Sequence, residues 1–74
     1  MMDENERRDA ELIRDRLKKI LPELKLAYAN AKSLEFEHNW DMNSFDMCEA
    51  YMTLAEAYIG VMEVFAEEDE GGAE

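Results

Sequence analysis

Apolar residues recur at alternating steps of four and three over two long stretches of the chain. This spacing places them on one face of an α-helix and is typical of helices that pack on one another. The strict alternation that predicts β-strands is absent. We therefore predict an all-α fold in which two helices meet along two apolar seams. The first seam is Ile13, Leu17, Ile20, Leu24, Ala27, Ala31 and Leu34, and the second is Cys48, Tyr51, Ala55, Tyr58, Met62 and Phe65.

The predicted elements form a single domain over residues 1–74. We expect a first helix over residues 9–37, a loop over 38–44, a second helix over 45–68, and an acidic tail over 69–74 that frays. A connection of this length is ordinary between antiparallel neighbours. Asn43 or Ser44 can cap the second helix, and Asp46 places a negative charge in its first turn, where the helix dipole favours one.

Pro22 is the only proline, and it falls inside the first predicted helix. The apolar phase continues through it, so we predict one helix kinked near Pro22. The alternative is a new helix that starts at Pro22 and gives a three-helix bundle, since proline suits a first helical turn. That reading makes Leu21 the N-cap, which is a poor residue for that position.

Folding the chain back about Asp41 brings the two seams together as an antiparallel hairpin. Leu34 would then face Cys48, and Leu17 would face Phe65. Two charged rows with a seven-residue repeat would also meet, and each exposed pair would contribute about 0–1 kcal/mol. The alternative is that both rows are solvated and share only the heptad spacing. The rows are Lys18, Lys25 and Lys32 on the first helix and Glu49, Glu56 and Glu63 on the second.

The second helix is apolar over more of its circumference than one facing helix can cover. A chain of 74 residues also buries little of its surface, and Cys48, the only cysteine, cannot form a disulfide within the chain. We therefore predict a homodimer in which two hairpins form a four-helix bundle. The residues expected to flank the dimer contact are Met47, Met52, Leu54, Ile59, Gly60 and Val61.

The formal net charge is -11, and it is unevenly distributed. All eight basic residues lie at or before Lys32, whereas twelve acidic residues and no lysine or arginine follow from Ser33 onward. This distribution argues against direct nucleic-acid binding and against an anionic membrane surface, because both need cationic protein. An acidic surface attracts basic proteins, and carboxylates on a helix can imitate a row of phosphates.

We therefore predict an acidic protein-binding surface that docks on a nuclease or another nucleic-acid-binding protein, in the manner of inhibitors that mimic DNA. The alternatives are an assembly module with incidental charge, a metal-binding helical bundle, and an acidic surface kept only for solubility. The acidic surface consists of Glu49, Glu56, Glu63, Glu67, Glu68, Asp69 and Glu70.

Few residues offer other chemistry. Glu35 and His38 form a Glu-x-x-His motif of the kind that binds metal in helical bundles, although a second copy must come from a dimer. Cys48 has only His38 as a base and no orienting partner, so we expect no enzyme and no cofactor. Trp40 in the loop is a candidate anchor for a partner, but we favour its closing the end of the core.

The lone cysteine and the polar first residues lead us to expect a cytoplasmic protein. No apolar run approaches the roughly 20 residues that cross a bilayer, so we expect no membrane-spanning segment.

Overall fold

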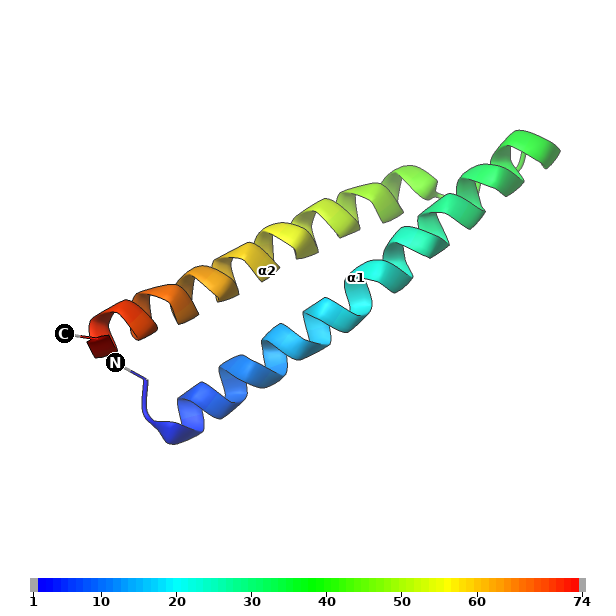
Figure 1. The fold of residues 1–74 in the computed structure, drawn as a ribbon. Helices are drawn as coiled ribbons and strands as arrows, with labels where there is room; N and C mark the ends of the chain where they lie inside the picture. The colour runs from blue at the N-terminus through cyan, green and yellow to red at the C-terminus, as the bar shows by residue number, and fades with distance from the viewer. Residues whose placement is uncertain (1, 74) are drawn as a thin grey trace.

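The computed structural model describes the backbone of residues 2–73 and the side chains of residues 2–69. It consists of two α-helices, α1 (Glu4–His38) and α2 (Ser44–Ala73), and the described residues contain no strand. The helices run side by side in opposite directions, with both termini at one end and the loop at the other (Figure 1). The predicted all-α helical hairpin is therefore confirmed. Glu70, from the predicted acidic surface, lies outside the described side chains.

Helix α1 starts at Glu4, earlier than the predicted start at residue 9. Asp3 Oδ1 accepts a hydrogen bond of 2.8 Å from the backbone N–H of Glu6, and Glu6 Oε1 accepts one of 3.2 Å from the backbone N–H of Asp3. This capping box satisfies two N–H groups at the helix end. The predicted start was wrong because it followed the first apolar residue of the seam, although Asp3-x-x-Glu6 already marks a helix start in the sequence.

The same helix continues through Pro22 to His38. The three-helix alternative is therefore wrong, and the continuous apolar phase was the better guide. Asn39 ends the helix with a left-handed backbone (φ 58°), and its N–H donates to the Glu35 carbonyl at 2.9 Å. Asparagine tolerates this conformation better than most residues, which explains why the chain can leave the helix here.

Helix α2 starts at Ser44 and continues to Ala73, so the predicted end at residue 68 was too early. No proline interrupts the acidic end, and the ion pair between Arg7 Nη2 and Asp69 Oδ1 (3.4 Å) ties this part of α2 to α1. The acids that oppose the helix dipole here therefore do not end the helix, and the tail that was expected to fray from residue 69 is helical as far as Ala73.

The two helices meet along seams that are rotated from the predicted ones. Ile13 and Ile20, which were predicted to be in the seam, are about half exposed, and so is Met62. Every second predicted seam position is kept, and the positions between them move one residue further along α1 and one residue earlier on α2. The kept residues are Leu17, Leu24 and Ala31 on α1 and Tyr51, Tyr58 and Phe65 on α2. The observed seams are Arg14, Leu17, Leu21, Leu24, Tyr28, Ala31 and Glu35 on α1, and Ser44, Met47, Tyr51, Leu54, Tyr58, Val61 and Phe65 on α2.

This rotation also changes the register. Glu35 lies against Ser44, with 2.5 Å between Glu35 Oε1 and the Ser44 hydroxyl, where Leu34 had been expected to face Cys48. Arg14 reaches the other end of the seam, with its guanidinium carbon 5.1 Å from the centroid of the Phe65 ring. Polar residues thus occupy both ends of the α1 seam, and a search for apolar positions alone cannot find them.

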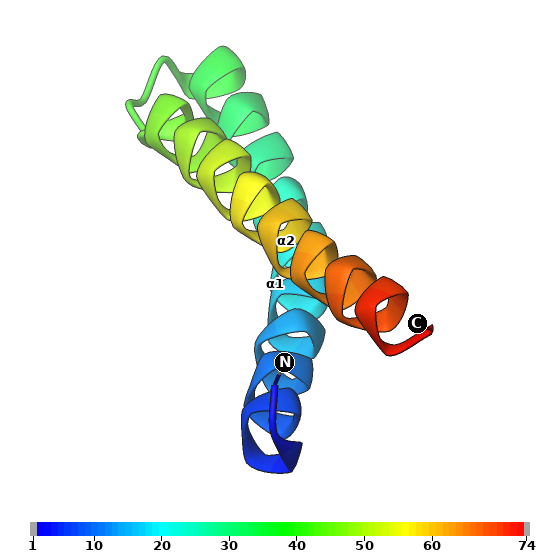
Figure 2. The ribbon, with the colours of Figure 1, turned by 90° about the vertical axis from the view of Figure 1, so that its left-hand side faces the viewer.

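The molecule is a rod with very little interior. Its dimensions are 58 × 17 × 13 Å and its radius of gyration is 16.9 Å, against about 11 Å for a compact domain of this length. The helix axes are inclined to each other, so the ribbons cross when seen from the side (Figure 2). Among the described side chains, only Ala31 and Phe65 are buried apolar residues.

Candidate protein-binding surfaces

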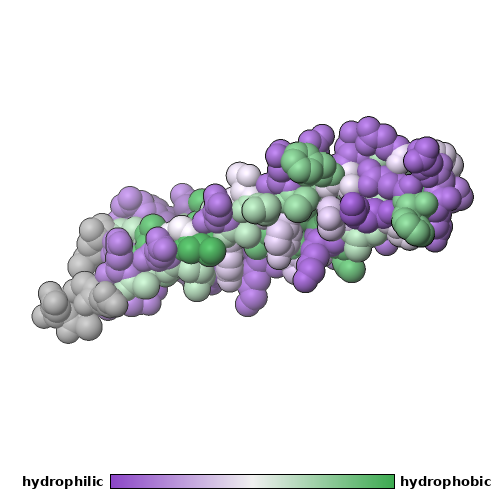
Figure 3. Space-filling view, turned by 90° about the horizontal axis from the view of Figure 1, so that it is seen from above, coloured by the Kyte–Doolittle hydropathy of each residue, from purple (hydrophilic) through white to green (hydrophobic). Residues whose placement is uncertain are grey.

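Helix α2 carries a second apolar stripe beside its seam, which we call the outer stripe: Phe45, Cys48, Met52, Ala55, Ile59 and Met62. These residues also alternate in steps of three and four, so they follow one side of the helix. Phe45 is 72% exposed, and Met52 and Ile59 are each 58% exposed. From above, apolar side chains reach the surface between polar ones along the rod (Figure 3). Phe45 was expected only to start the second helix, although Phe45, Met52 and Ile59 repeat every seven residues.

The residues that were predicted to flank a dimer contact lie on different sides of α2. Met47, Leu54 and Val61 are half-buried at seam positions within the hairpin, and their predicted place at a dimer contact stays a prediction. Met52 and Ile59 are exposed members of the outer stripe. Gly60 is exposed on another side of α2, and a Cβ built on it would meet no atom within 4 Å.

The lysine row of α1 lies along one side of the outer stripe. Lys25 lines a small hollow between the helices together with Tyr28, Cys48 and Tyr51. Because Lys18 and Lys32 stand one heptad before and after Lys25, they follow the same side of α1. All three lysines are exposed.

The glutamate row of α2 lies along the opposite side of the outer stripe. Glu49 and Glu56 line a shallow surface hollow together with Phe45, Met52 and other residues of this side. At these positions the row points away from α1, which is why the predicted pairing with the lysines within the chain does not form. Among the described residues, no ion pair joins the glutamate row to the lysine row.

The rest of the predicted acidic surface continues toward the C-terminal end of α2. Glu67 is exposed and Glu68 is half-buried. Asp69 is paired with Arg7, and the guanidinium carbon of Arg7 also lies 5.5 Å from the centroid of the Phe65 ring. The acidic residues therefore do not form one uniform surface, because this end is partly neutralised by α1.

The hairpin has another apolar face on the side away from the lysine row. It consists of Ile13, Ile20, Ala27 and Leu34 from α1 and Ala50, Ala57 and Val64 from α2. Ile13, Ile20 and Val64 are about half exposed. Apolar surface is therefore open on both sides of the hairpin.

Glu35 closes the loop between the helices. Its carboxylate accepts hydrogen bonds from the backbone N–H groups of Met42 (3.0 Å) and Ser44 (3.4 Å) and from the Ser44 hydroxyl. The hydroxyl bond is the largest cause that lowers the pKa of Glu35; both N–H groups and the Lys32 charge act in the same direction, and partial burial opposes them. Glu35 therefore stabilises the start of α2, where the helix dipole favours a negative charge.

His38, the other residue of the predicted metal motif, stacks on Trp40 with ring centroids 4.4 Å apart and an angle of 20° between the planes. The described residues contain no group of three His, Cys, Asp or Glu side chains that could hold a metal. Within one hairpin, Glu35 thus accepts hydrogen bonds from the loop and the start of α2, and His38 stacks on Trp40.

Trp40 is 55% exposed, so the preferred interpretation that it closes the core was wrong. The core of the hairpin ends at Glu35 and Ser44, which leaves the loop outside it. Phe36 is 92% exposed near the same end. The loop end therefore presents Trp40 and Phe36 to the solvent, which suits the alternative interpretation of Trp40 as an anchor for a partner.

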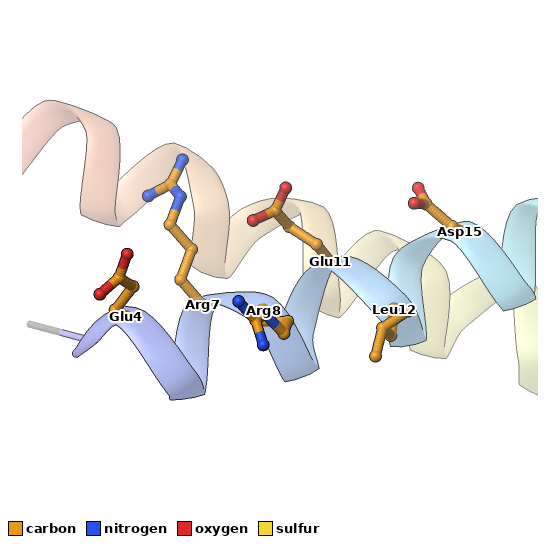
Figure 4. A pocket seen from close by; sticks show the side chains of 6 residues that line it. All are labelled: Glu4, Arg7, Arg8, Glu11, Leu12 and Asp15. Carbon is orange, nitrogen blue, oxygen red and sulfur yellow. The ribbon is translucent and has the colours of Figure 1, made fainter.

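A hollow also follows the first turns of α1, lined by Glu4, Arg7, Arg8, Glu11, Leu12 and Asp15. All six side chains come from one helix, and Arg7 extends toward α2 (Figure 4). Three acids and two arginines line it, so it gathers neither a uniform charge nor a convergent set of groups. We assign no binding site to it.

No protein-family model, curated protein or solved structure matches this chain. In addition, neither helix has, within its described residues, the length and apolar character that crossing a bilayer requires.

Proposed function

We propose that this chain is a non-catalytic protein-binding protein whose first partner is a second copy of itself. The observation that carries the proposal is the uncovered apolar surface of the hairpin. Within the described part of the chain, eleven large apolar side chains are more than 40% exposed, whereas Ala31 and Phe65 are the buried apolar residues there. A larger assembly would give this surface a place to be buried.

The energetics favour assembly over an isolated hairpin. Full burial of a large apolar side chain contributes about 1.5–3 kcal/mol, and in proteins most helical stability comes from packing of an apolar face. A hairpin that leaves Phe45, Met52 and Ile59 in water gains little of the free energy that burial of these side chains would contribute. Pairing two hairpins into a four-helix bundle buries such side chains without any change in topology.

Sedimentation equilibrium tests the proposal directly. The chain has a mass of 8.6 kDa, and we expect a mass of about twice that value at micromolar concentration, falling toward the monomer on dilution. Helix content measured by circular dichroism should fall with dilution as well. A fully helical monomer across the whole concentration range would contradict self-association.

A second candidate function is docking on a basic protein surface, such as that of a nuclease or another nucleic-acid-binding protein. It is favoured by the charge of -11 and by the exposed glutamate row, which repeats every seven residues with no ion pair to any described residue. Such contacts weaken steeply as salt is added.

Capture from the native cell with the tethered protein, followed by elution in a salt gradient, tests this candidate. We expect a basic protein to elute early in the gradient and to be displaced by duplex DNA. The variant Glu56→Lys/Glu63→Lys should lose the captured protein, and equal recovery with that variant would contradict docking through the glutamate row.

A further inference from the structure

The outer stripe of α2 lies between two rows of opposite charge, and the two rows do not pair with each other within the described part of the hairpin. The lysine row belongs to α1 and the glutamate row to α2, and the described residues contain no ion pair between them. Both rows repeat every seven residues, as the outer stripe does. An apolar surface bordered by one positive and one negative row is complementary to a rotated copy of itself.

We propose that the outer stripe is the self-association surface, and that two copies pair through it about a two-fold axis parallel to the helices. The proposal rests on the self-association proposed above and names the surface and the geometry. In this arrangement, α2 of one copy lies against α2 of the other, running in the same direction. The lysine row of each copy then borders the glutamate row of the other.

The direction of pairing follows from the charges. A two-fold axis perpendicular to the helices would bring the glutamate rows together and the lysine rows together, and like charges at an interface are costly. The parallel axis brings opposite rows together instead. Because both rows repeat every seven residues, each lysine lies within about 5 Å along the axis of a glutamate in the other copy.

The geometry also explains the width of the apolar surface on α2. In a rhombic bundle of this kind, α2 has three neighbours: its own α1, the other α2 and the other α1. Its seam faces the first, and the outer stripe faces the other two. Helix α1 has only two neighbours, and its remaining surface carries charged residues together with exposed apolar ones such as Ile13, Ile20 and Leu26.

The available area is sufficient for a stable dimer. From Phe45 to Met62 the outer stripe is about 26 Å long at 1.5 Å per residue. A standard interface buries about 800 Å² on each partner, which is roughly one eighth of the 6046 Å² that the chain exposes. Contact of each α2 with two helices of the other copy can supply that area.

Reversal of the charged rows tests the pairing. We expect Glu49→Lys/Glu56→Lys to weaken the dimer about tenfold or more, although it reduces the net charge from -11 to -7. Generic repulsion between acidic chains predicts the opposite sign. Lys18→Glu/Lys25→Glu should also weaken the dimer, and the four changes together should restore it.

The matched control is Asp9→Lys/Glu23→Lys, which makes the same change in net charge on another side of α1. The dissociation constant of this control dimer should equal that of the unchanged protein or be lower. Dissociation constants come from sedimentation, and circular dichroism at high concentration confirms that each variant is helical.

Disulfide cross-linking tests the direction of the helices. Parallel pairing places Cys48 level with Cys48 of the other copy, so mild oxidation should give a covalent dimer, whereas antiparallel pairing of the stripe would place Cys48 near Ile59. In Cys48→Ser/Ala50→Cys, the thiol lies near the same level of α2 on the other side of the seam, and we expect it to cross-link much more slowly.

The outcomes separate the two proposals. A dimer that forms but is indifferent to both charge reversals, or cross-links faster through residue 50 than through Cys48, overturns the outer stripe as the interface and leaves self-association standing. A chain that remains monomeric at every concentration overturns both.

Discussion

At the scale of single residues, Glu35 has the clearest role. It accepts three hydrogen bonds from the loop and the start of α2, and these bonds hold the pKa of its carboxyl below the ordinary value of 4.5. A carboxyl whose folded pKa is depressed stabilises the fold at pH values above its unfolded pKa. That contribution is lost as the pH falls through the folded pKa.

Replacing Glu35 by Gln should therefore lower the thermal midpoint at pH 7, and the deficit relative to the natural chain should shrink as the pH falls below about 4.5. Glutamine retains an oxygen acceptor but not the charge. Asp3, whose pKa is also lowered, chiefly by the Glu6 backbone N–H, is present in both proteins, so the difference isolates Glu35. A deficit that is constant from pH 7 to pH 3 would rule out an ionic role.

The sequence identified Glu35 but not what it does. A glutamate one turn before a helix-terminal histidine fits a metal motif, and only the fold places it opposite the start of α2. The same limit applies to Trp40, because its burial depends on where the core ends. Asp3 is different, since its capping partner Glu6 is local and both can be recognised from spacing alone.

At the scale of elements, substitution of Gly60 tests which side of α2 contacts another helix. It stands in the interior of the helix with open space around it, and glycine there costs about 1 kcal/mol relative to alanine. Gly60→Ala should raise the unfolding free energy by about that amount in urea titrations and leave the dimer constant unchanged. A weaker dimer would mean that another helix approaches closely at Gly60.

Pro22 provides a second test within α1. It removes one N–H from a continuous helix, so the Lys18 carbonyl lacks its usual donor. Because residue 22 is exposed, Pro22→Ala should stabilise the protein by about 2–3 kcal/mol without changing its association. If α1 were two helices joined at Pro22, the substitution would be neutral or destabilising, and the urea midpoint distinguishes these outcomes.

Both helices and their antiparallel arrangement could be predicted from the sequence because apolar periodicity and short-range capping are local properties. The rotation of the seams could not be predicted in the same way. Arg14 and Glu35 occupy seam positions by placing their charged groups at the ends of the contact, against Phe65 and Ser44. A pattern of apolar residues alone favours Ile13 and Ile20, whose burial would require a further partner.

At the scale of the whole molecule, the hairpin consists of two long, well-formed helices that bury very few side chains between them. Its charge distribution separates the possible partners. The glutamate row cannot border the lysine row of a second copy and dock on a basic protein at the same time. Self-association and acidic docking therefore compete for Glu49 and Glu56, and a basic partner should dissociate the dimer if both functions exist.

If folding and association are coupled, the thermal midpoint must depend on protein concentration. With an unfolding enthalpy of about 0.7 kcal/mol per residue, two chains together absorb about 100 kcal/mol, so a tenfold increase in concentration should raise the midpoint by about 5 °C. Glu49→Lys/Glu56→Lys should lower the midpoint at every concentration while keeping this dependence. A midpoint that stays constant over a hundredfold range would mean that one hairpin is stable alone, and the exposed Phe45, Met52 and Ile59 would then need a different partner to explain them.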